Sequence, residues 1–386
     1  MKINKFFAVV IISVWGALVI LNIVVPKKDF SELENRQLEP WPSWDTGEFI
    51  EGNLMLNVEK YLNDRVIWRD QWVEMKCLAE LAIGKNENGG IYITNDRLIE
   101  NISRPDADKV EKNIEGVNSL KKIYDGNIYV LIVPSAMSVQ EKYLPGKAAS
   151  WDQRGFLNGV YEKLADGIKP VSVYDTLASH ADEYIFYRTD HHWTAEGAYY
   201  SYLEFAKEAG LKQRERSEFE ITKLTDDFNG TLYSKSGFRG VKPDEIYKYE
   251  TGKVKIYEKN LKFAGGKMFT NDSHDTIYFD EQLSVKDKYA YFLKENVTFA
   301  KITTESESGK KLLIFKDSYA MSFVPMLLDD YSEIMLVDMR YDTTNFTKIV
   351  NFDDYDDTLF LYSTDLFANQ KATEKLAMVS EILSQK

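Results

Sequence analysis

The sequence predicts an α/β fold, in which helices flank a mostly parallel sheet, preceded by one membrane-spanning helix. Hydrophobic residues make up 44% of the 386 positions, which is enough to bury a sizeable core. From about residue 105 onward, short apolar runs alternate with helical patterns, as they do in parallel sheets. A further apolar run covers residues 6–25. Together these observations favour a large, anchored domain of the α/β class.

The N-terminal run is long enough to cross a bilayer. About 20 helical residues, each rising roughly 1.5 Å, span the hydrocarbon core of about 30 Å. No small-residue cleavage site follows the run, which favours a retained signal-anchor over a cleaved signal peptide. Two lysines precede it and two follow it, so the positive-inside comparison is nearly balanced. We expect residues 1–26 to be a single-pass anchor in the cell membrane, with the remainder on one side of it.

Two regions are expected after the anchor. Residues 27–60 are polar and contain two prolines and two tryptophans, which is typical of a stalk. Residues 61–386 form the main domain, which begins with helical periodicity. Within it, residues 211–305 interrupt the strand–helix alternation with mixed polar and aromatic sequence. We expect this stretch to be an inserted, β-rich lobe.

Short apolar runs mark the expected strands of the sheet, and polar residues follow each run. In open α/β sheets, ligands bind beyond the carboxyl ends of the strands. Asp317 and Ser318 follow one such run, and Asp338 and Arg340 follow another. We therefore expect the chemistry at this edge of the sheet. The expected strands are Ile128–Val133, Val171–Tyr174, Leu312–Phe315, Ile334–Val337 and Thr358–Tyr362.

Charge and cysteine content exclude some classes of function. The chain has 61 acidic and 48 basic residues, which gives a formal net charge of -13. A surface of this sign repels phosphate backbones, so we expect no nucleic-acid partner. Cys77 is the single cysteine, which excludes an internal disulfide and a four-cysteine metal site.

One segment combines an acid and a base just ahead of a helix. Residues 187–197 have the sequence Tyr-Arg-Thr-Asp-His-His-Trp-Thr-Ala-Glu-Gly, in which Thr194 is the expected helix N-cap. Asp190 and His192 are two apart, so on an extended segment their side chains project to the same side. Asp190 could then orient the imidazole of His192 and stabilise its protonated form. We expect His191 to be structural or to hydrogen-bond substrate.

A second segment places a serine between a strand and a helix expected from Met321 to Leu328. Residues 311–320 have the sequence Lys-Leu-Leu-Ile-Phe-Lys-Asp-Ser-Tyr-Ala. At a helix N-terminus the backbone N–H of Ser318 could bind a developing oxyanion. The hydroxyl needs a base to take its proton, and His192 is the best of only four histidines. Each residue alone could be a cap or a buried hydrogen-bonding group, but the combination predicts a Ser–His–Asp triad.

The sequence Asp-His-His-Trp-Thr-Ala-Glu-Gly-Ala at 190–198 resembles the signature of the DHHW family. That family in turn is similar to the SGNH-like acetyltransferase domains of the alginate O-acetylation proteins, which carry Asp-x-His-Trp in the equivalent place. The resemblance covers nearly the whole chain in the same order. Other matching segments are Phe30–Arg36, Tyr61–Arg65, Gly230–Ser234 and Lys316–Tyr319.

The resemblance implies an SGNH-hydrolase-like fold and an extracytoplasmic O-acyltransferase that transfers acetyl. It implies Ser318 as the nucleophile, with Asp190 and His192 as the acid–base half of the triad. The acceptor would be a hydroxyl of a cell-surface or secreted polysaccharide. A membrane-bound O-acyltransferase would be the partner that delivers the acyl group across the bilayer. No metal or other cofactor is expected.

The sequence also departs from the usual hydrolase pattern. Lys316 stands where that pattern has glycine, and no glycine or asparagine can be assigned to the oxyanion hole. Arg340 is a candidate contact for substrate or oxyanion, although an ion pair with Asp338 is an equal alternative. Further candidates for these contacts are His191, Asn229 and Tyr233.

Three alternative functions remain open. An esterase or deacetylase would use the same triad but hand the acyl group to water. A metal-dependent phosphoesterase family shares Asp-His-His, but it needs further aspartates at the ends of upstream strands, where none is evident. Chelator-sensitive activity that survives Ser318→Ala would indicate that family. A non-catalytic glycan-binding protein would keep the fold and lack a reactive serine.

Overall fold

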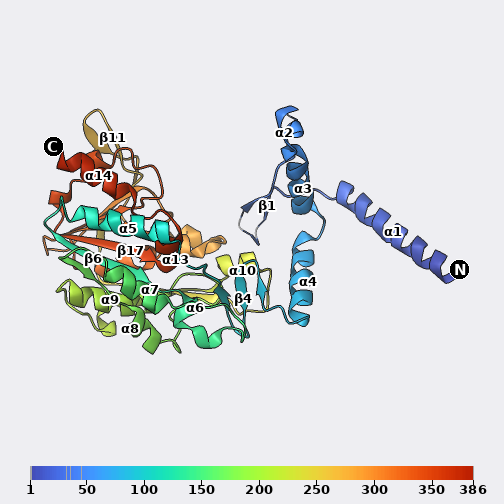
Figure 1. Ribbon diagram of the computed structural model, residues 1–386, viewed down its shortest axis with the longest axis horizontal. Helices are drawn as coiled ribbons and strands as arrows, with labels where there is room; N and C mark the ends of the chain where they lie inside the picture. The colour runs from blue at the N-terminus through green and yellow to red at the C-terminus, as the bar shows by residue number, and fades with distance from the viewer. Residues whose placement is uncertain (1, 32, 35, 45, 386) are drawn as a thin grey trace. The chain divides into compact units, whose positions relative to one another are not determined.

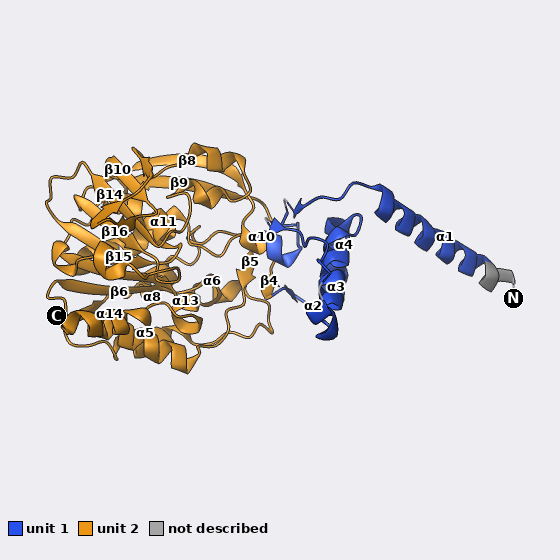
Figure 2. Cartoon of the chain, turned by 90° about the horizontal axis from the view of Figure 1, so that it is seen from above, with its two compact units in different colours: residues 1–89, 233–240 blue, residues 90–232, 241–386 orange. Residues whose placement is uncertain are grey.

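The computed structural model describes residues 2–31, 33–34, 36–44 and 46–385, and Figure 1 shows the helices and strands along the chain. The chain divides into two compact units, which Figure 2 shows in different colours. The first unit comprises Met1–Gly89 and Tyr233–Gly240, and the second comprises Gly90–Leu232 and Val241–Lys386. The boundary at residue 89 thus falls later in the sequence than residue 60, where the expected stalk ends.

The first unit is mostly helical. Its N-terminal helix contains a 19-residue segment, Phe6–Val24, which is long and apolar enough to cross a membrane. This helix stops just before Pro26, because proline cannot continue the α-helical hydrogen bonding. The elements of the unit are α1 (Lys2–Val24), β1 (Phe30–Ser31), β2 (Arg36–Gln37), α2 (Thr46–Ile50), α3 (Asn53–Arg65), α4 (Arg69–Ala82) and β3 (Glu87–Asn88).

Asp64 on α3 joins two of the segments that carry the family resemblance. Its carboxylate accepts hydrogen bonds from Nη1 and Nη2 of Arg36, at 2.7 and 2.6 Å, and from the backbone N–H of Glu39 at 2.9 Å. Hydrogen bonding to the guanidinium lowers the pKa of Asp64 to about 2. These bonds tie the β1–β2 hairpin to α3. Two residues of the first segment, Glu32 and Asn35, lie outside the described residues.

The second unit is built around a large sheet. Within the described residues this sheet has eight strands in the order β13-β10-β14-β16-β15-β17-β6-β7. Neighbours from β16 to β7 run parallel, as the sequence predicts, whereas β14, β10 and β13 pair antiparallel at the opposite edge. The strands are β6 (Asn127–Val133), β7 (Ile168–Pro170), β10 (Val254–Lys259), β13 (Asp272–His274), β14 (Phe299–Thr304), β15 (Lys311–Lys316), β16 (Glu333–Val337) and β17 (Asp357–Ser363).

Helices cover both faces of this sheet, so its central strands are buried. Side chains alternate along β15 between the two faces. Ile314 packs in the core that contains Phe205 of α9, and Phe315 packs in the core that contains Val117 of α5. The helices of the unit include α5 (Ala107–Leu120), α6 (Ala136–Val139), α7 (Gln153–Tyr161), α8 (Tyr174–Ser179), α9 (Ala195–Glu208), α11 (Ala320–Phe323), α12 (Phe346–Ile349), α13 (Thr364–Asn369) and α14 (Lys375–Ser384).

The stretch 211–305, expected to be an insertion, contributes to two structures. It supplies β10, β13 and β14 to the edge of the large sheet, and it also contains a separate antiparallel pair, β8 (Glu220–Phe228) with β9 (Asp244–Glu250). A small hairpin, β11 (Lys262–Ala264) with β12 (Lys267–Phe269), follows β10. The short helix α10 (Thr231–Ser236) begins directly after β8. Part of the expected lobe is therefore an extension of the main sheet.

The expected strand Val171–Tyr174 is not one in the structure. Strand β7 ends at Pro170, and only the N–H of Val171 extends the pairing, to the carbonyl of Val130 at 2.8 Å. Tyr174 then begins α8. The run is apolar because it packs into the core beneath the sheet, and burial alone does not distinguish a strand from other buried backbone.

The helix expected from Met321 to Leu328 is also different. It is divided into α11 (Ala320–Phe323) and a 3-10 turn over Val324–Leu327. Pro325 lies within that turn, and its missing N–H cannot donate to the preceding helical turn. A four-residue helix has a weaker dipole than the one expected after Ser318.

Candidate active site

The segment 187–193 forms a closed loop in front of α9. Phe186 and Trp193 are paired in an antiparallel bridge, and the N–H of Tyr187 donates to the carbonyl of His192 at 3.2 Å. Thr194 caps the helix, since its hydroxyl accepts a hydrogen bond from the N–H of Gly197 at 3.4 Å. The expected N-cap is confirmed, and the loop is anchored at both of its ends.

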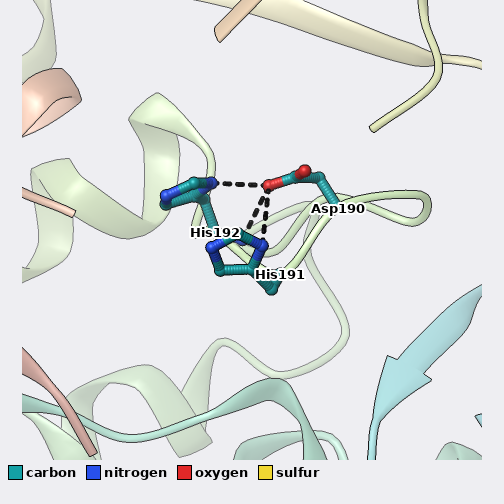
Figure 3. Close-up of side chains that lie close together, drawn as sticks. All are labelled: Asp190, His191 and His192. Atoms are coloured by element: carbon teal, nitrogen blue, oxygen red, sulfur yellow. Dashed lines mark hydrogen bonds and ion pairs between the residues drawn. The ribbon is translucent and has the colours of Figure 1, made fainter. Parts of the chain in front are cut away.

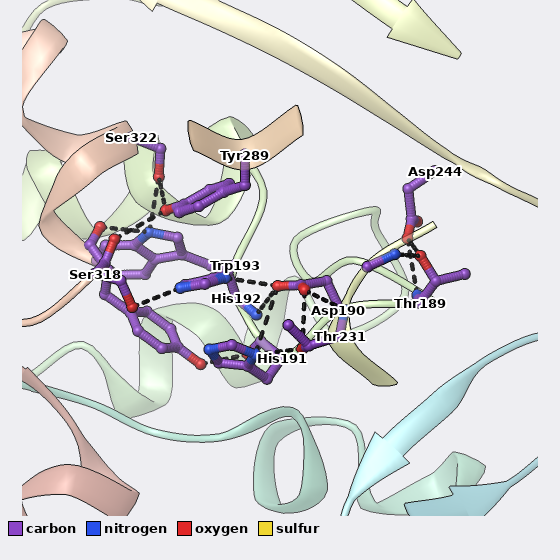
Figure 4. Close-up of polar contacts among 12 residues, drawn as sticks. Thr189, Asp190, His191, His192, Trp193, Thr231, Asp244, Tyr289, Ser318 and Ser322 are labelled. Carbon is purple, nitrogen blue, oxygen red and sulfur yellow. Dashed lines mark hydrogen bonds and ion pairs between the residues drawn. The ribbon is translucent and has the colours of Figure 1, made fainter. Parts of the chain in front are cut away.

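The loop brings Asp190 and His192 against Ser318, which lies 126 positions after His192 in the chain (Figure 4). Asp190 Oδ1 lies 2.6 Å from His192 Nδ1, and His192 Nε2 lies 2.7 Å from Ser318 Oγ. The carboxylate can only accept, so Nδ1 carries the proton and donates to it. Nε2 is then free to accept the proton of the serine hydroxyl. The three side chains are therefore arranged in the order acid, base and nucleophile, as in a catalytic triad.

Asp190 is held as a carboxylate by its partners. Burial raises its pKa, but attraction to His191 and His192 and hydrogen bonds from His192 and Thr231 outweigh burial and hold the pKa well below its usual range. The backbone N–H and the hydroxyl of Thr231 donate to Oδ2 at 2.8 and 3.0 Å. Both carboxylate oxygens therefore have donors, which fixes the orientation of the group.

His192 is buried between two rings. The ring of Tyr289 stacks on it with centroids 4.0 Å apart and an interplanar angle of 16°, and the ring of His191 lies 3.9 Å away. Burial and the neighbouring His191 lower the pKa of His192, and Asp190 opposes this only in part. The imidazole is therefore neutral near pH 7, which is the state that can accept a proton.

Ser318 lies in the tight turn that follows β15, at the carboxyl end of the parallel strands. The turn is held by Asp317, whose carboxylate accepts from the N–H of Tyr319 at 2.9 Å and from the N–H of Ser363 at 2.8 Å. Ser363 ends the neighbouring strand β17. The hydroxyl of Tyr289 donates to the carbonyl of Ser318 at 3.2 Å. Asp317 thus has a structural role, and Ser318 is partly exposed at the rim where the sequence places it.

Trp193 joins the two segments from beneath. It is fully buried, and its indole N–H donates to the carbonyl of Tyr319 at 3.1 Å and to Ser322 Oγ at 3.0 Å. In the other direction, the hydroxyl of Tyr319 donates to the carbonyl of His191. These crossed hydrogen bonds hold the serine turn against the histidine loop.

Asp244 on β9 anchors the start of the histidine loop, and sequence reasoning missed it. Its buried carboxylate accepts from the N–H of Thr189 at 2.8 Å, from Thr189 Oγ1 and Tyr184 Oη at 2.5 Å each, and from the N–H of Arg188 at 2.8 Å. Burial raises the pKa of Asp244. It lies 55 positions from Thr189, so no local sequence signal could have linked them.

Gly230 and Thr231 were also missed as neighbours of Asp190, although the family resemblance includes their segment. A Cβ on Gly230 would lie 2.4 Å from both Cβ and Oδ2 of Asp190, which is too close for any side chain. The N–H of Gly230 donates to Thr189 Oγ1 at 3.0 Å. The glycine is therefore required by a close approach between two chain segments.

Arg340 lies in an ion pair with Asp338. Its Nε and Nη2 donate to the two carboxylate oxygens at 2.8 and 2.6 Å, and the carboxylate is fully buried. This bidentate pair agrees with the alternative interpretation of Arg340 as an ion-pairing residue.

The other three candidate contacts have different surroundings. His191 is partly exposed, and its Nδ1 lies 2.8 Å from Thr231 Oγ1. Asn229 precedes Gly230, and its Oδ1 is buried without a hydrogen-bond partner among the described residues. Tyr233 belongs to the first compact unit, where Arg239 lies over its ring at 4.4 Å.

Asp190, His191 and His192 also have the donor atoms of a possible metal site, because these atoms lie within 4.8 Å of one another (Figure 3). The same atoms already make hydrogen bonds. Nδ1 of His192 is bonded to Asp190, and Nδ1 of His191 is bonded to Thr231. A metal ion here would have to replace these bonds, and it would separate His192 from the carboxylate that orients it.

Comparison with known proteins identifies one family. A model of the DHHW protein family matches residues 73–337, which is more than half of the chain. No curated protein matches the sequence.

Several solved structures are similar to this one. A DHHW family protein from Eubacterium siraeum DSM 15702 shares 26% sequence identity, with a TM-score of 0.60 over 74% of this chain and 96% of that one. Bacillus cereus PatB1, solved with a sulfonyl adduct, shares 18% identity, with a TM-score of 0.58 over 73% and 96%. These two likenesses support the α/β fold. The O-acetyltransferase domain of Pseudomonas putida AlgJ shares 14% identity over 76% and 99%, and its TM-score of 0.45 is too low to support an inference.

Proposed function

This chain belongs to the DHHW protein family, and we propose that it is an O-acyltransferase that modifies polysaccharide hydroxyls through Ser318, His192 and Asp190. The observation that supports this most strongly is the distance of 2.7 Å between His192 Nε2 and Ser318 Oγ. A neutral, buried imidazole beside a partly exposed serine at a strand end is the arrangement that activates a nucleophile. The resemblance of Asp-His-His-Trp at 190–193 to the Asp-x-His-Trp motif of the alginate O-acetylation proteins supports transfer and supports acetyl as the group.

The proposed reaction has two steps. In the first, Ser318 Oγ attacks the donor carbonyl while His192 takes the serine proton; the bond from the acyl carbon to the donor's leaving group breaks, and the leaving group departs with that proton. In the second, a sugar hydroxyl loses its proton to His192 and attacks the acyl-serine; the bond from the acyl carbon to Ser318 Oγ breaks, and His192 returns the proton to the serine. Asp190 stabilises the imidazolium formed in both steps. The α1 helix would hold the enzyme in the cell membrane with the catalytic unit outside the cytoplasm, where a membrane-bound O-acyltransferase could supply the acyl group.

The test uses a fluorophosphonate probe on the full-length protein, with the adduct located by mass spectrometry. We expect modification of Ser318, which disappears in Ser318→Ala and in His192→Ala. The chain offers a matched control in His274, whose Nε2 lies 2.7 Å from Asp272 at the same two-residue spacing. His274→Ala should label like the wild type, and so should wild type treated with a chelator. A folded protein with unmodified Ser318 would contradict the proposal.

Transfer and hydrolysis use the same triad, so a second measurement separates them. The protein is incubated with an aryl acetate donor and an acceptor oligosaccharide, and the mass of the oligosaccharide is measured by mass spectrometry. Transfer predicts a glycan heavier by acetyl groups, whereas a deacetylase removes them from an acetylated glycan. Release of free acetate alone, in the presence of acceptor, would indicate an esterase.

A further inference from the structure

Helix α4 carries an apolar stripe on its outer face. Trp68, directly before the helix, lines one surface pocket together with Trp72 and Met75. Trp72, Met75 and Leu78 are spaced three residues apart, so they lie on one side of the helix. In sequence order, the exposed fractions of these four side chains are 53%, 44%, 52% and 50%. The opposite side contains the buried Cys77, which is where the helix packs against its own unit. An amphipathic surface helix normally exposes a polar face, so this second apolar stripe needs a partner.

The stripe begins where α1 ends. The N–H of Ile67 donates to Asn22 Oδ1 of α1 at 3.1 Å, and Lys27 Nζ donates to the carbonyl of Arg65 at 2.8 Å. These bonds tie the end of the apolar helix to the turn between α3 and α4. One pocket is lined by residues from both sides of this junction, including Leu21 and Val25 together with Trp68.

We propose that the α4 stripe rests in the headgroup region of the bilayer that α1 crosses. This inference rests on the proposed membrane anchoring by α1. If α1 spans the hydrocarbon core, its last turn lies at the membrane surface, and the residues bonded to that turn lie at the same depth. Trp side chains are enriched in this interfacial region, because the indole ring is apolar and its N–H is polar. The α4 stripe would bind the membrane surface as a monotopic amphipathic helix does. This binding would limit rotation of the first unit about α1.

The experiment is fluorescence quenching in the full-length protein reconstituted into phosphatidylcholine vesicles. One set of vesicles carries bromine near the headgroup, and another carries it near the end of the acyl chain. We expect tryptophan quenching by the shallow bromine to be weaker in Trp68→Phe and in Trp72→Phe than in the wild type. In each variant, the decrease in quenching should be at least about two-fold larger with the shallow bromine than with the deep bromine. Trp15→Phe, in the middle of α1, should instead lose the quenching by deep bromine.

Two controls make the outcome decisive. Trp151→Phe, a partly buried residue of the second unit, should change neither signal. Hydrogen exchange in α3 and α4 of each variant reports that the first unit is intact, and fluorophosphonate labelling of Ser318 reports the same for the second unit. If Trp15 is quenched by deep bromine while the residues of the stripe stay accessible to aqueous acrylamide, α1 is inserted but the stripe is not in the membrane. That result overturns the inference and indicates a protein partner for the stripe. If Trp15 is not quenched either, the anchoring itself is wrong.

Discussion

At the scale of the residue, His192 is subject to opposing influences. Burial and electrostatic repulsion from His191 disfavour the cationic form of His192, while the carboxylate of Asp190 favours it. The balance leaves the imidazole neutral at rest, with a counter-charge already placed at 2.6 Å for the moment when it accepts a proton. A base of this kind stabilises charge that develops during reaction more than charge in the resting state.

Replacement of Asp190 by asparagine tests this charge. The substituted side chain would lack the negative charge, and its NH₂ group would face the N–H donors that the carboxylate now accepts. We expect D190N to lower kcat/KM for an aryl acetate by about 10³- to 10⁴-fold, because the imidazole loses its correct tautomer and its stabilised cation. The matched control is Asp272→Asn, which alters the other Asp-x-His pair. A loss of less than about ten-fold with the fold intact would show that Asp190 does not orient the base.

The pH dependence of labelling follows from the lowered pKa of His192. Because burial disfavours the imidazolium, the reactive neutral form persists below the ordinary histidine range. The rate of fluorophosphonate labelling should be constant near pH 7 and should fall only as the pH drops through the lowered pKa.

His191→Asn should move the acid limb of the same profile toward higher pH. The substitution removes a neighbour that lowers the pKa of His192, and it leaves Asp190 in place. The measurement is the apparent pKa of the labelling rate in the two proteins. A shift toward lower pH would contradict this account of the site.

At the scale of the element, the site is where three segments meet. The loop before α9 supplies Asp190 and His192, the turn after β15 supplies Ser318, and the segment between β8 and α10 supports Asp190 from behind. The third segment contributes no reacting group, but its backbone fills the space behind the carboxylate. Small changes there should therefore act on catalysis through position.

Gly230→Ala tests that support. The new Cβ would lie 2.4 Å from Asp190 Cβ and Oδ2, so either the carboxylate or the 228–231 backbone must move. We expect stability to fall by about 1–3 kcal/mol, as for other overpacked sites. Labelling of Ser318 should slow by at least about ten-fold, because a small displacement of Asp190 would misalign His192 and lower the reaction rate.

Gly159→Ala is the matched control for that substitution. Gly159 lies inside α7, and no atom lies within 4 Å of the added Cβ. The alanine should be neutral or should stabilise the protein by about 0.5–1 kcal/mol. Chemical denaturation and labelling rate, measured on both variants, separate the two effects. Equal labelling in G230A and wild type would mean that the Asp190 carboxylate tolerates displacement.

At the scale of the whole molecule, the two compact units have separate supporting interactions. In the first unit, the Asp64–Arg36 pair closes the β1–β2 hairpin onto α3. In the second, the two cores on either face of the sheet support the candidate active site. Damage to the first unit should therefore leave the reactivity of Ser318 unchanged.

Arg36→Ala tests this separation. Asp64 is largely buried, so loss of its charged donors should weaken the first unit locally by about 1–3 kcal/mol. Hydrogen exchange should accelerate in α3 and remain unchanged in β15 and β17. Lys85→Ala, which removes a half-exposed ammonium paired with Glu80 at 3.2 Å, should alter exchange less than R36A does. Slower labelling of Ser318 in R36A would show that the units are energetically coupled.

Local sequence was sufficient to select the candidate reacting groups, which the structure brings together, and to predict the strands near them. A short, continuous apolar run between polar segments favours a buried strand, so β6, β15, β16 and β17 were predictable. The much longer run at the N-terminus is exposed in the structure, and its length predicted a helix that could cross a membrane. The strand-end position of Ser318 and the two-residue spacing of Asp190 and His192 follow from the same local rules. Periodicity failed at Val171–Tyr174, because burial is a property shared by strands and other core segments.

Only the tertiary structure decided which distant segments meet. The contact between His192 and Ser318 spans 126 positions, and Asp244, Gly230 and Tyr289 support the site from parts of the chain that no local pattern links to it. The stretch 211–305 carried a mixed pattern, yet three of its strands extend the main sheet. The physical reason is that local patterns determine which side chains avoid water, whereas strand order and side-chain pairing depend on hydrogen bonds and packing between segments far apart in sequence.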